Sequence, residues 1–408
     1  MIKKYLKSFT VIFYSILFVL NCGAVFAHSQ YDKYHADVKA GIEKAFNMEI
    51  SHANDYLQKA VELDPENPTG YAFLAMINLF AYDMSYNENE AENRQDSLLN
   101  YVNETIIRGE KKISENPKDS NAYLAMAIAR TVRLNWYIRK KKESIHLAHE
   151  TSVTWDSIKK AQEYNPQNYD TYFLTGLFRY HIDHFPGLPR FFASLLITSG
   201  DRQKGLQEIK LASQKGDLLK LPALLELFSV YSNFEKQPTR ALSIISKFKK
   251  DFPDNYNFYF ALANVHSDLH RFDDAFNIAG EIENNIRSGI SPFIPQLQPR
   301  YDQLMGRIFL TAGNYTKAEE YLQKALKDKT RFNARVRAWA YVRLGMISDA
   351  RKEREKAENY YSKVKEIKEG EGVARIEARK YLKNPYVPPI QEAEKPAAAP
   401  NGNGIKKN

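Results

Sequence analysis

The sequence predicts an all-α protein, an α-solenoid of about eight helix–turn–helix repeats. One stretch carries the pattern clearly: within residues 313–326, Ala318 and Ala325 flank Leu322, and Gly306 lies one helix earlier. Small residues at this spacing let two helices cross closely, because a larger side chain would push their axes apart. The pattern recurs along most of the chain with few strand signals, which favours a repeat architecture over a globular core.

Prolines support the same division of the chain. They recur where a second helix is expected to end, at Pro65, Pro117, Pro166 and Pro253. Proline cannot donate a backbone hydrogen bond and disfavours helix at the residue before it, so it ends one repeat and begins the turn to the next. The small residues and the prolines recur at matching positions of successive repeats, and both patterns predict the same division of the chain.

In these positions the chain resembles the tetratricopeptide repeat (TPR) family, whose unit of about 34 residues is a pair of antiparallel helices. The resemblance extends over about residues 34–382. Its first repeat is carried by Gly41, Ala53, Leu57, Ala60 and Pro65, and its eighth by Tyr341, Leu344, Gly345, Ala357 and Tyr361. Insertions near 83–95, 139–142 and 181–198 interrupt the middle repeats.

We therefore predict four segments. Residues 1–27 form a signal peptide, 31–290 hold divergent repeats with insertions, and 299–383 hold regular repeats and a capping helix. A cap is expected because the last repeat of an array would otherwise expose its apolar face. Residues 384–408 are rich in Pro, Ala and Gly, and we predict a flexible tail there.

The N-terminal segment has the composition of a secretory signal. Residues 1–7 are basic, residues 9–20 form an apolar run too short for a membrane span, and Val25 and Ala27 fit a cleavage site after Ala27. This pattern predicts export, most simply into a bacterial periplasm. Two alternatives stay open: the segment is kept as an inner-membrane anchor, or the chain is a lipoprotein attached through Cys22.

Composition fits an ordered protein, with 44% hydrophobic and 26% charged residues and a net charge of +9. Lysine and arginine alternate with glutamate and aspartate, as in 352–356, which is typical of solvated helix faces. Because no basic stripe with a recognition motif is visible, we predict that the protein does not bind nucleic acid.

The sequence contains no motif that predicts catalysis. It lacks a nucleophile elbow, a phosphate-binding loop and a dinucleotide-binding fingerprint. Three histidine pairs have helical spacing, but none has the glutamate of the HExxH zinc motif; they are His146 and His149, His181 and His184, and His266 and His270. We predict no enzyme activity, no cofactor and no metal.

The leading hypothesis is a scaffold that binds a protein or peptide partner in the cell envelope, in the concave groove lined by the first helices of the repeats. Candidate groove residues, chosen because they avoid the packing positions, are Asn78, Arg130, Asn264 and Arg343. The basic members suit a carboxylate-bearing segment. Peripheral association with a membrane and the oligomeric state are left open.

The alternative is an envelope enzyme or a protein that binds a metal or small ligand in a pocket at the insertion 181–198. The residues available there for such chemistry are His181, Asp183, His184 and Arg190.

Overall fold

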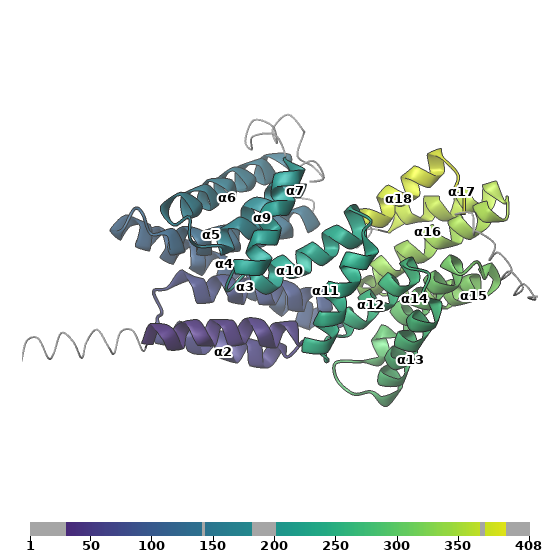
Figure 1. Ribbon diagram of the computed structural model, residues 1–408, viewed down its shortest axis with the longest axis horizontal. Helices are drawn as coiled ribbons and strands as arrows, with labels where there is room; N and C mark the ends of the chain where they lie inside the picture. The colour runs from purple at the N-terminus through teal and green to yellow at the C-terminus, as the bar shows by residue number, and fades with distance from the viewer. Residues whose placement is uncertain (1–29, 141–142, 182–200, 368–371, 389–408) are drawn as a thin grey trace, which may run out of the picture. The chain divides into compact units, whose positions relative to one another are not determined.

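The computed structural model describes residues 30–140, 143–181, 201–367 and 372–388. Over these residues the chain forms helices and no strand (Figure 1). It divides into two compact units, Met1–Tyr301 and Asp302–Asn408, which we call the N-terminal and the C-terminal unit. The sequence places the start of the regular repeats at residue 299. Among the described residues, no helix combines the length and the apolar composition needed to cross a membrane.

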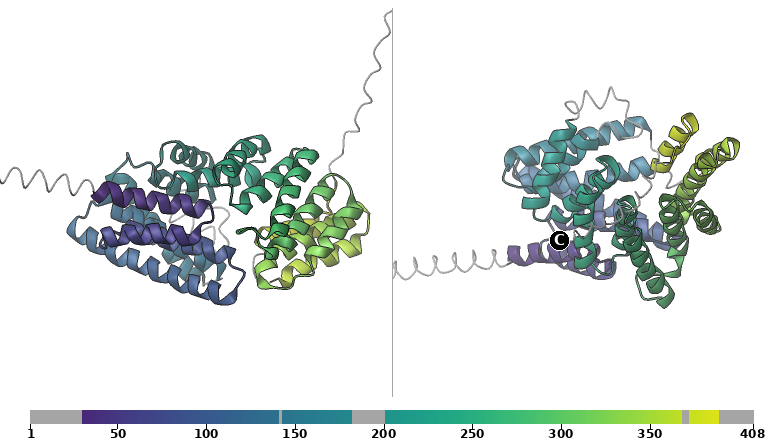
Figure 2. Two further views of the ribbon diagram at one scale, coloured as in Figure 1. Left: turned by 90° about the horizontal axis from the view of Figure 1, so that it is seen from below. Right: turned by 45° about the vertical axis from the view of Figure 1, so that its right-hand side comes forward.

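The described part of the N-terminal unit contains six helix pairs. They are residues 30–46 with α2 (Ile50–Leu63), α3 (Pro68–Met84) with α4 (Glu88–Glu115), α5 (Ser120–Arg139) with α6 (Ser144–Tyr164), α7 (Asp170–His181) with α9 (Arg202–Lys215), α10 (Lys220–Ser229) with α11 (Pro238–Asp251), and α12 (Tyr256–Asp268) with α13 (Phe272–Ser288). A π-helical turn, Val230–Phe234, follows α10. Figure 2 shows the first pair, in purple, beside the blue α3–α4 pair.

The C-terminal unit continues the pattern with two pairs and a single helix. The pairs are α14 (Gln298–Thr311), which begins before the division between the units, with α15 (Tyr315–Ala325), and α16 (Ala334–Ala350) with α17 (Arg354–Lys363); α18 (Gly372–Lys383) follows. Short 3₁₀ turns precede α14 and α16 and follow α17. Over the described residues the predicted all-α solenoid of about eight repeats is confirmed.

Polar side chains fix where several helices begin. Asn87, for example, accepts the backbone N–H of Glu90 at 3.1 Å and so caps α4. Glu88 and Glu90 lie in the first turn, where negative charge suits the positive end of the helix dipole. The stretch 83–95, which we expected to be an insertion between helices, is therefore mostly helix: its acidic residues lengthen α4 to 28 residues.

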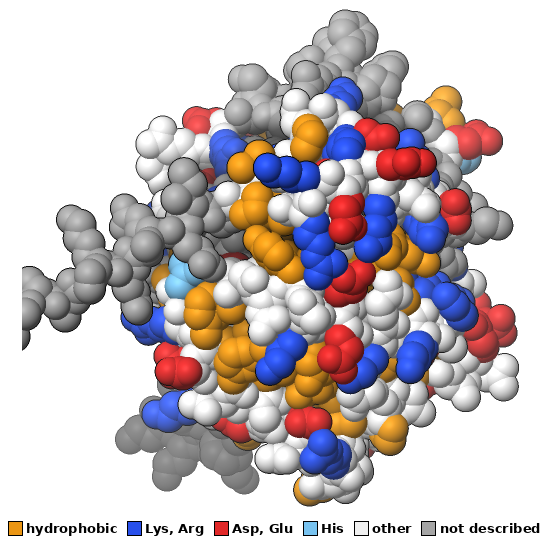
Figure 3. All heavy atoms as spheres, turned by 90° about the vertical axis from the view of Figure 1, so that its right-hand side faces the viewer, with side chains coloured by type: hydrophobic (Ala, Val, Ile, Leu, Met, Phe, Trp, Pro, Cys, Tyr) orange, Lys and Arg blue, Asp and Glu red, His pale blue; other side chains and the backbone are white. Residues whose placement is uncertain are grey.

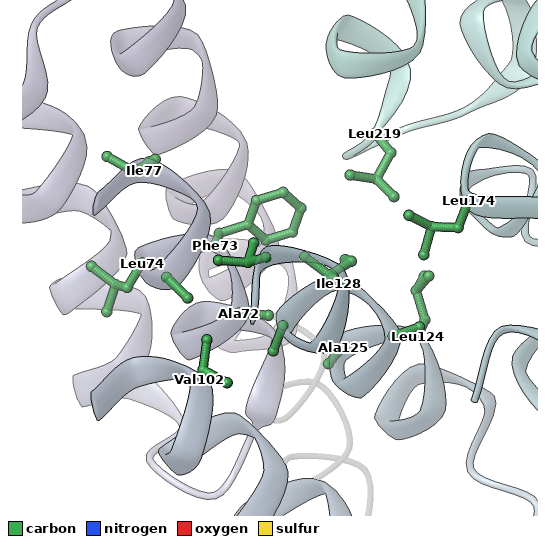
Figure 4. Close-up of a cluster of buried hydrophobic side chains, with 14 of the residues drawn as sticks. Ala72, Phe73, Leu74, Ile77, Val102, Leu124, Ala125, Ile128, Leu174 and Leu219 are labelled. Atoms are coloured by element: carbon green, nitrogen blue, oxygen red, sulfur yellow. The ribbon is translucent and has the colours of Figure 1, made fainter. Parts of the chain in front are cut away.

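Small residues lie where paired helices cross, as the spacing predicts. Ala318 and Ala325 are fully buried, and a Cβ on Gly306 would lie 2.6 Å from Leu322 Cγ. Larger cores join successive pairs. In Figure 4, Phe73 of α3, Ile128 of α5, Leu174 of α7 and Leu219 lie around a common interior.

The middles of α3 and α5 are buried on every side. Residues 70–75 of α3 and 122–129 of α5 are all buried, including their small side chains. A helix normally buries one stripe and exposes the other, so consecutive burial over more than a turn means neighbours all round. These first helices therefore present no open face at mid-length.

Contacts also join parts of the N-terminal unit that are distant in sequence. The Phe46 ring stacks on Phe248, 5.8 Å between centroids, and Asn255 donates to the Phe46 carbonyl at 2.8 Å. His35 Nε2 lies 2.6 Å from a carboxylate oxygen of Asp217. Helix 30–46 is thus attached to the turns around α10 and α11, far along the sequence.

The packing predicts the effect of enlarging a crossing residue. Replacing Ala318 by leucine should lower the free energy of unfolding by about 1–3 kcal/mol, because the fully buried site has no room for three further carbons. Thermal unfolding measures this, and Thr316→Leu, exposed on the same helix, is the control. Equal melting temperatures for the two variants would show that Ala318 is not a close-packing site.

Candidate functional site

Positive charge is concentrated in the C-terminal unit. Residues 302–388 contain 20 Lys and Arg against 12 Asp and Glu, a net +8, while the whole chain has +9. Residues 28–301 contain 32 Lys and Arg against 35 Asp and Glu. The local alternation of basic and acidic residues along the sequence does not reveal this segregation. A unit with an excess of positive charge attracts negatively charged partners.

The two second helices of this unit carry a matching pair of residues. Tyr321 and Lys324 on α15 correspond to Tyr360 and Lys363 on α17. The i,i+3 spacing puts each lysine on the same helix face as its tyrosine. The lysine Nζ lies 4.7 Å from the Tyr321 centroid in the first pair and 5.6 Å from the Tyr360 centroid in the second, within cation–π range.

Further rings join these pairs into one surface. Phe309 stacks on Tyr321 at 5.6 Å, with Lys317 Nζ 5.3 Å from its centroid. Tyr341 lies 6.4 Å from Tyr360, and Lys363 Nζ is 5.7 Å from the Tyr341 centroid. The Gln323 amide donates to the Tyr360 hydroxyl at 3.3 Å and so links the two repeats. We call this set the Lys–aromatic face: Phe309, Lys317, Tyr321, Gln323, Lys324, Tyr341, Tyr360 and Lys363.

The exposure of the face suits binding. Its rings are half-buried, so their positions are fixed while their outer edges stay in contact with water, and Lys317 and Lys324 are exposed. A hydrogen bond from Lys324 to Glu320 raises the pKa of the lysine and so favours its charged form. Figure 3, which looks onto the right-hand side of Figure 1, shows basic side chains lying between hydrophobic ones on one surface.

Comparison with known proteins identifies the repeats that carry this face. Residues 303–327 and 340–371 match a family model described as a tetratricopeptide repeat. The C-terminal unit contains tetratricopeptide repeats. No curated protein sequence matches the chain.

Several solved structures share the helical-repeat architecture. A human IFIT1 dimer with m7Gppp-AAAA is 15% identical, with a TM-score of 0.45, over 85% of this chain and 80% of that one. A tetratricopeptide repeat protein from Parabacteroides merdae ATCC 43184 is 13% identical, with a TM-score of 0.33, over 76% and 99%. Yeast Tom70 is 12% identical, with a TM-score of 0.27, over 86% and 97%.

The four groove residues predicted from sequence lie on four different helices, α3, α5, α12 and α16. Asn78 is buried, donates to the Leu74 carbonyl at 2.8 Å, and accepts a longer hydrogen bond from Arg94 at 3.4 Å. Its amide is therefore used within the fold. Asn264 is half-buried on α12.

The two arginines among them are also largely enclosed. Arg130 lies 3.9 Å from the buried carboxylate of Glu150, and burial lowers the pKa of its guanidinium. Arg133 lies 3.0 Å from the same carboxylate. Arg343 is 8% exposed, with its guanidinium carbon 5.0 Å from the Trp339 ring centroid. A partner-binding role for any of the four residues stays a prediction.

The alternative pocket at 181–198 lies outside the described residues, apart from His181. The Nε2 atom of His181 lies 2.7 Å from a carboxylate oxygen of Glu226. Nearby, burial raises the pKa of Tyr180 to about 12, and its hydroxyl donates to Glu235 at 2.6 Å. Asp183, His184, Arg190 and Cys22 are not described.

The remaining histidine pairs are separate from this cluster. His146 and His149 are exposed on α6, and His266 Nδ1 lies 3.5 Å from Asp274, with its pKa lowered by burial. His270 follows α12. Within the described ranges, no three His, Cys, Asp or Glu side chains are arranged to hold a metal ion.

Proposed function

We propose that this protein is a non-enzymatic tetratricopeptide-repeat scaffold of the cell envelope, which binds an acidic protein segment through its Lys–aromatic face. The observation that carries the proposal is the pairing of lysines with half-buried rings, in matching positions of two adjacent repeats, within a stretch (residues 302–388) of net charge +8. Export of the mature chain, through the N-terminal signal, belongs to the proposal.

The chemistry of the face explains why it suits such a partner. Aromatic rings offer large apolar contact area and lose little conformational entropy when they bind, because packing already fixes them. Lysines above the rings add charge that attracts carboxylates and increases the association rate. Single exposed ion pairs contribute little, so recognition depends on several acting together.

The second helices are favoured over the concave groove as the contact surface. The groove hypothesis requires exposed side chains along the first helices, but the middles of α3 and α5 are enclosed on all sides. The Lys–aromatic face instead lies mainly on α15 and α17, whose outer residues remain in contact with water.

A triple variant tests the proposal. K317A/K324A/K363A should weaken binding of a fluorescent glutamate-rich peptide containing leucines by about tenfold, measured by anisotropy. The control K33A/K118A/K204A removes the same charge from exposed sites of the N-terminal unit and should leave the Kd within about twofold. Equal losses in both variants would show that only net charge matters, and the proposed face would be wrong.

Two further measurements separate other functions. Tighter binding of a single-stranded oligonucleotide than of the acidic peptide would replace the protein partner by a nucleic acid. Pull-down from the envelope fraction with the wild-type and K317A/K324A/K363A chains should yield a partner that only the wild type retains. Recovery of no specific partner would contradict the scaffold function.

A further inference from the structure

The helix α18 has no paired helix among the described residues. It packs on α16 and α17 through the buried Ala374 and Ala378, and its Tyr381 ring lies 5.7 Å from Tyr361. In the order of the array, this is the place of the first helix of a further pair. The second helix of that pair, which would cover its other side, is not present in the described chain.

The outward side of α18 has the character of an unfilled packing surface at one end. Val373 and Ile376 are 57% and 62% exposed, and Lys380 and Lys383 continue the same stripe at helical spacing. Together they lie opposite Ala374 and Ala378 around the helix. These two large apolar side chains, exposed one turn apart on one helix face, form an apolar strip of the kind that a neighbouring helix covers in a pair.

The positive charge in the second half of α18 indicates which kind of partner fits this surface. Arg379, Lys380 and Lys383 occupy the second half of α18, while Glu377 is its only acidic residue and lies 3.6 Å from Lys380. An acidic partner complements this end. In an antiparallel pair with a second copy of α18, Lys380 and Lys383 of one copy would face Val373 and Ile376 of the other, so each lysine would lie against apolar side chains without a carboxylate partner; this pairing is disfavoured.

The surface is held in a fixed position by hydrogen bonds at both ends of the helix. The Arg375 guanidinium donates to the Ile367 carbonyl at 3.0 Å, and Arg354 donates to the Leu382 carbonyl at 2.8 Å. After the helix, the backbone N–H of Tyr386 donates to the buried carboxylate of Asp349 at 2.8 Å. A pre-positioned helix face loses little entropy when a partner binds.

We propose that the outer face of α18 binds an acidic amphipathic helix of the partner protein, which pairs with α18 as the second helix of a further repeat. The pairs in this chain are antiparallel, so the N-terminal half of the incoming helix meets Arg379, Lys380 and Lys383, and its apolar C-terminal half covers Val373 and Ile376. Acidic residues near the N-terminus also suit the dipole of that helix. The inference rests on the proposed function, from which it takes an acidic protein segment as the partner.

The test uses the mature chain and a designed helical peptide with glutamates in its first half and leucines on one face of its second half. Wild-type protein should bind it, with slowed amide exchange in residues 372–383. Ile376→Asp should weaken binding at least tenfold, whereas Ile145→Asp, at a site 72% exposed in the N-terminal unit, should leave it within twofold. Circular dichroism confirms that both variants are folded. Binding that Ile376→Asp leaves unchanged would overturn the inference.

Two comparisons make this outcome distinct from failure of the proposed function. If K317A/K324A/K363A weakens binding of the glutamate-rich peptide but Ile376→Asp leaves binding of the designed helix unchanged, the Lys–aromatic face stands and the pairing with α18 is wrong. If Ile376→Asp weakens binding of the designed helix but K317A/K324A/K363A leaves binding of the glutamate-rich peptide unchanged, the pairing with α18 is supported and the role proposed for the Lys–aromatic face is wrong. A wild-type dimer that Ile376→Asp converts to a monomer, with no binding of the designed helix, would assign the surface to a second copy and overturn the inference.

Discussion

Replacing Gly176 by alanine should destabilise the N-terminal unit by about 2 kcal/mol. A Cβ at this position would lie 2.7 Å from the Gly205 carbonyl oxygen and 2.9 Å from the Ile209 nitrogen. Both are backbone atoms of α9, so relief requires the whole helix to move. Alanine gains about 1 kcal/mol of helix propensity over glycine, but overpacking costs about 1–3 kcal/mol and sometimes more, and here the overpacking should win.

The chain offers a matched control for this change. Gly280 lies within α13 with no neighbouring atom within 4 Å of an added Cβ, so Gly280→Ala should stabilise the same unit by up to about 1 kcal/mol. Urea unfolding of both variants measures the two free energies. Gly205→Ala should resemble Gly176→Ala, since its Cβ would lie 2.7 Å from the Tyr180 nitrogen. A stabilising effect at all three positions would mean that α7 and α9 do not cross as closely as described.

Close crossings of this kind are the part of the fold that could be predicted from the sequence. Gly306, Ala318 and Ala325 were recognisable because the requirement for a small residue is local and repeats at a fixed spacing. Insertions were harder, because a polar stretch such as 83–95 reads equally as loop or as solvated helix. Whether this stretch forms a helix depends on the Asn87 cap and on the packing of α4 against α3.

The surroundings of the candidate residues could not be predicted in this way. Asn78 was chosen because it avoids the packing positions of a single repeat, yet α3 is enclosed by neighbours. Contacts such as Phe46 with Phe248 join residues far apart in sequence, and no local pattern specifies them. The residues of the Lys–aromatic face did leave a signal, since a tyrosine followed three residues later by a lysine occurs at both 321–324 and 360–363. This sequence pattern does not show which of the side chains stay exposed in the folded protein.

Replacing Asp170 by alanine should lower the free energy of unfolding by about 3 kcal/mol. One carboxylate oxygen accepts the backbone N–H groups of Asp217 and Leu219, at 2.8 and 3.1 Å, and the other accepts that of Leu218 at 3.0 Å. Each buried N–H left without an acceptor costs about 1–3 kcal/mol. The full sum is not expected, because burial raises the pKa of Asp170, so the charged form itself bears a desolvation cost that the variant avoids.

Two variants grade the effect. Asp170→Asn keeps an oxygen for Asp217 and Leu219 but presents an amide to Leu218, so it should lose about half as much free energy of unfolding. Asp201→Ala removes an exposed cap at the start of α9, where the carboxylate accepts the Lys204 N–H at 2.9 Å, and should cost about 1 kcal/mol. A loss at Asp170→Ala no greater than at Asp201→Ala would show that the three N–H groups find other acceptors.

The consequence of losing Asp170 should extend beyond the turn that it holds. The turn between α9 and α10 also anchors helix 30–46, because Asp217 lies 2.6 Å from His35 and 3.3 Å from Lys39. If Asp170 fixes the turn, its removal should speed amide exchange both at 217–219 and in residues 30–46, while the C-terminal unit keeps its protection. Asp201→Ala should speed exchange only at the start of α9. The first helix would then depend on a carboxylate more than a hundred residues away in sequence, because the turn that Asp170 organises is also its docking site.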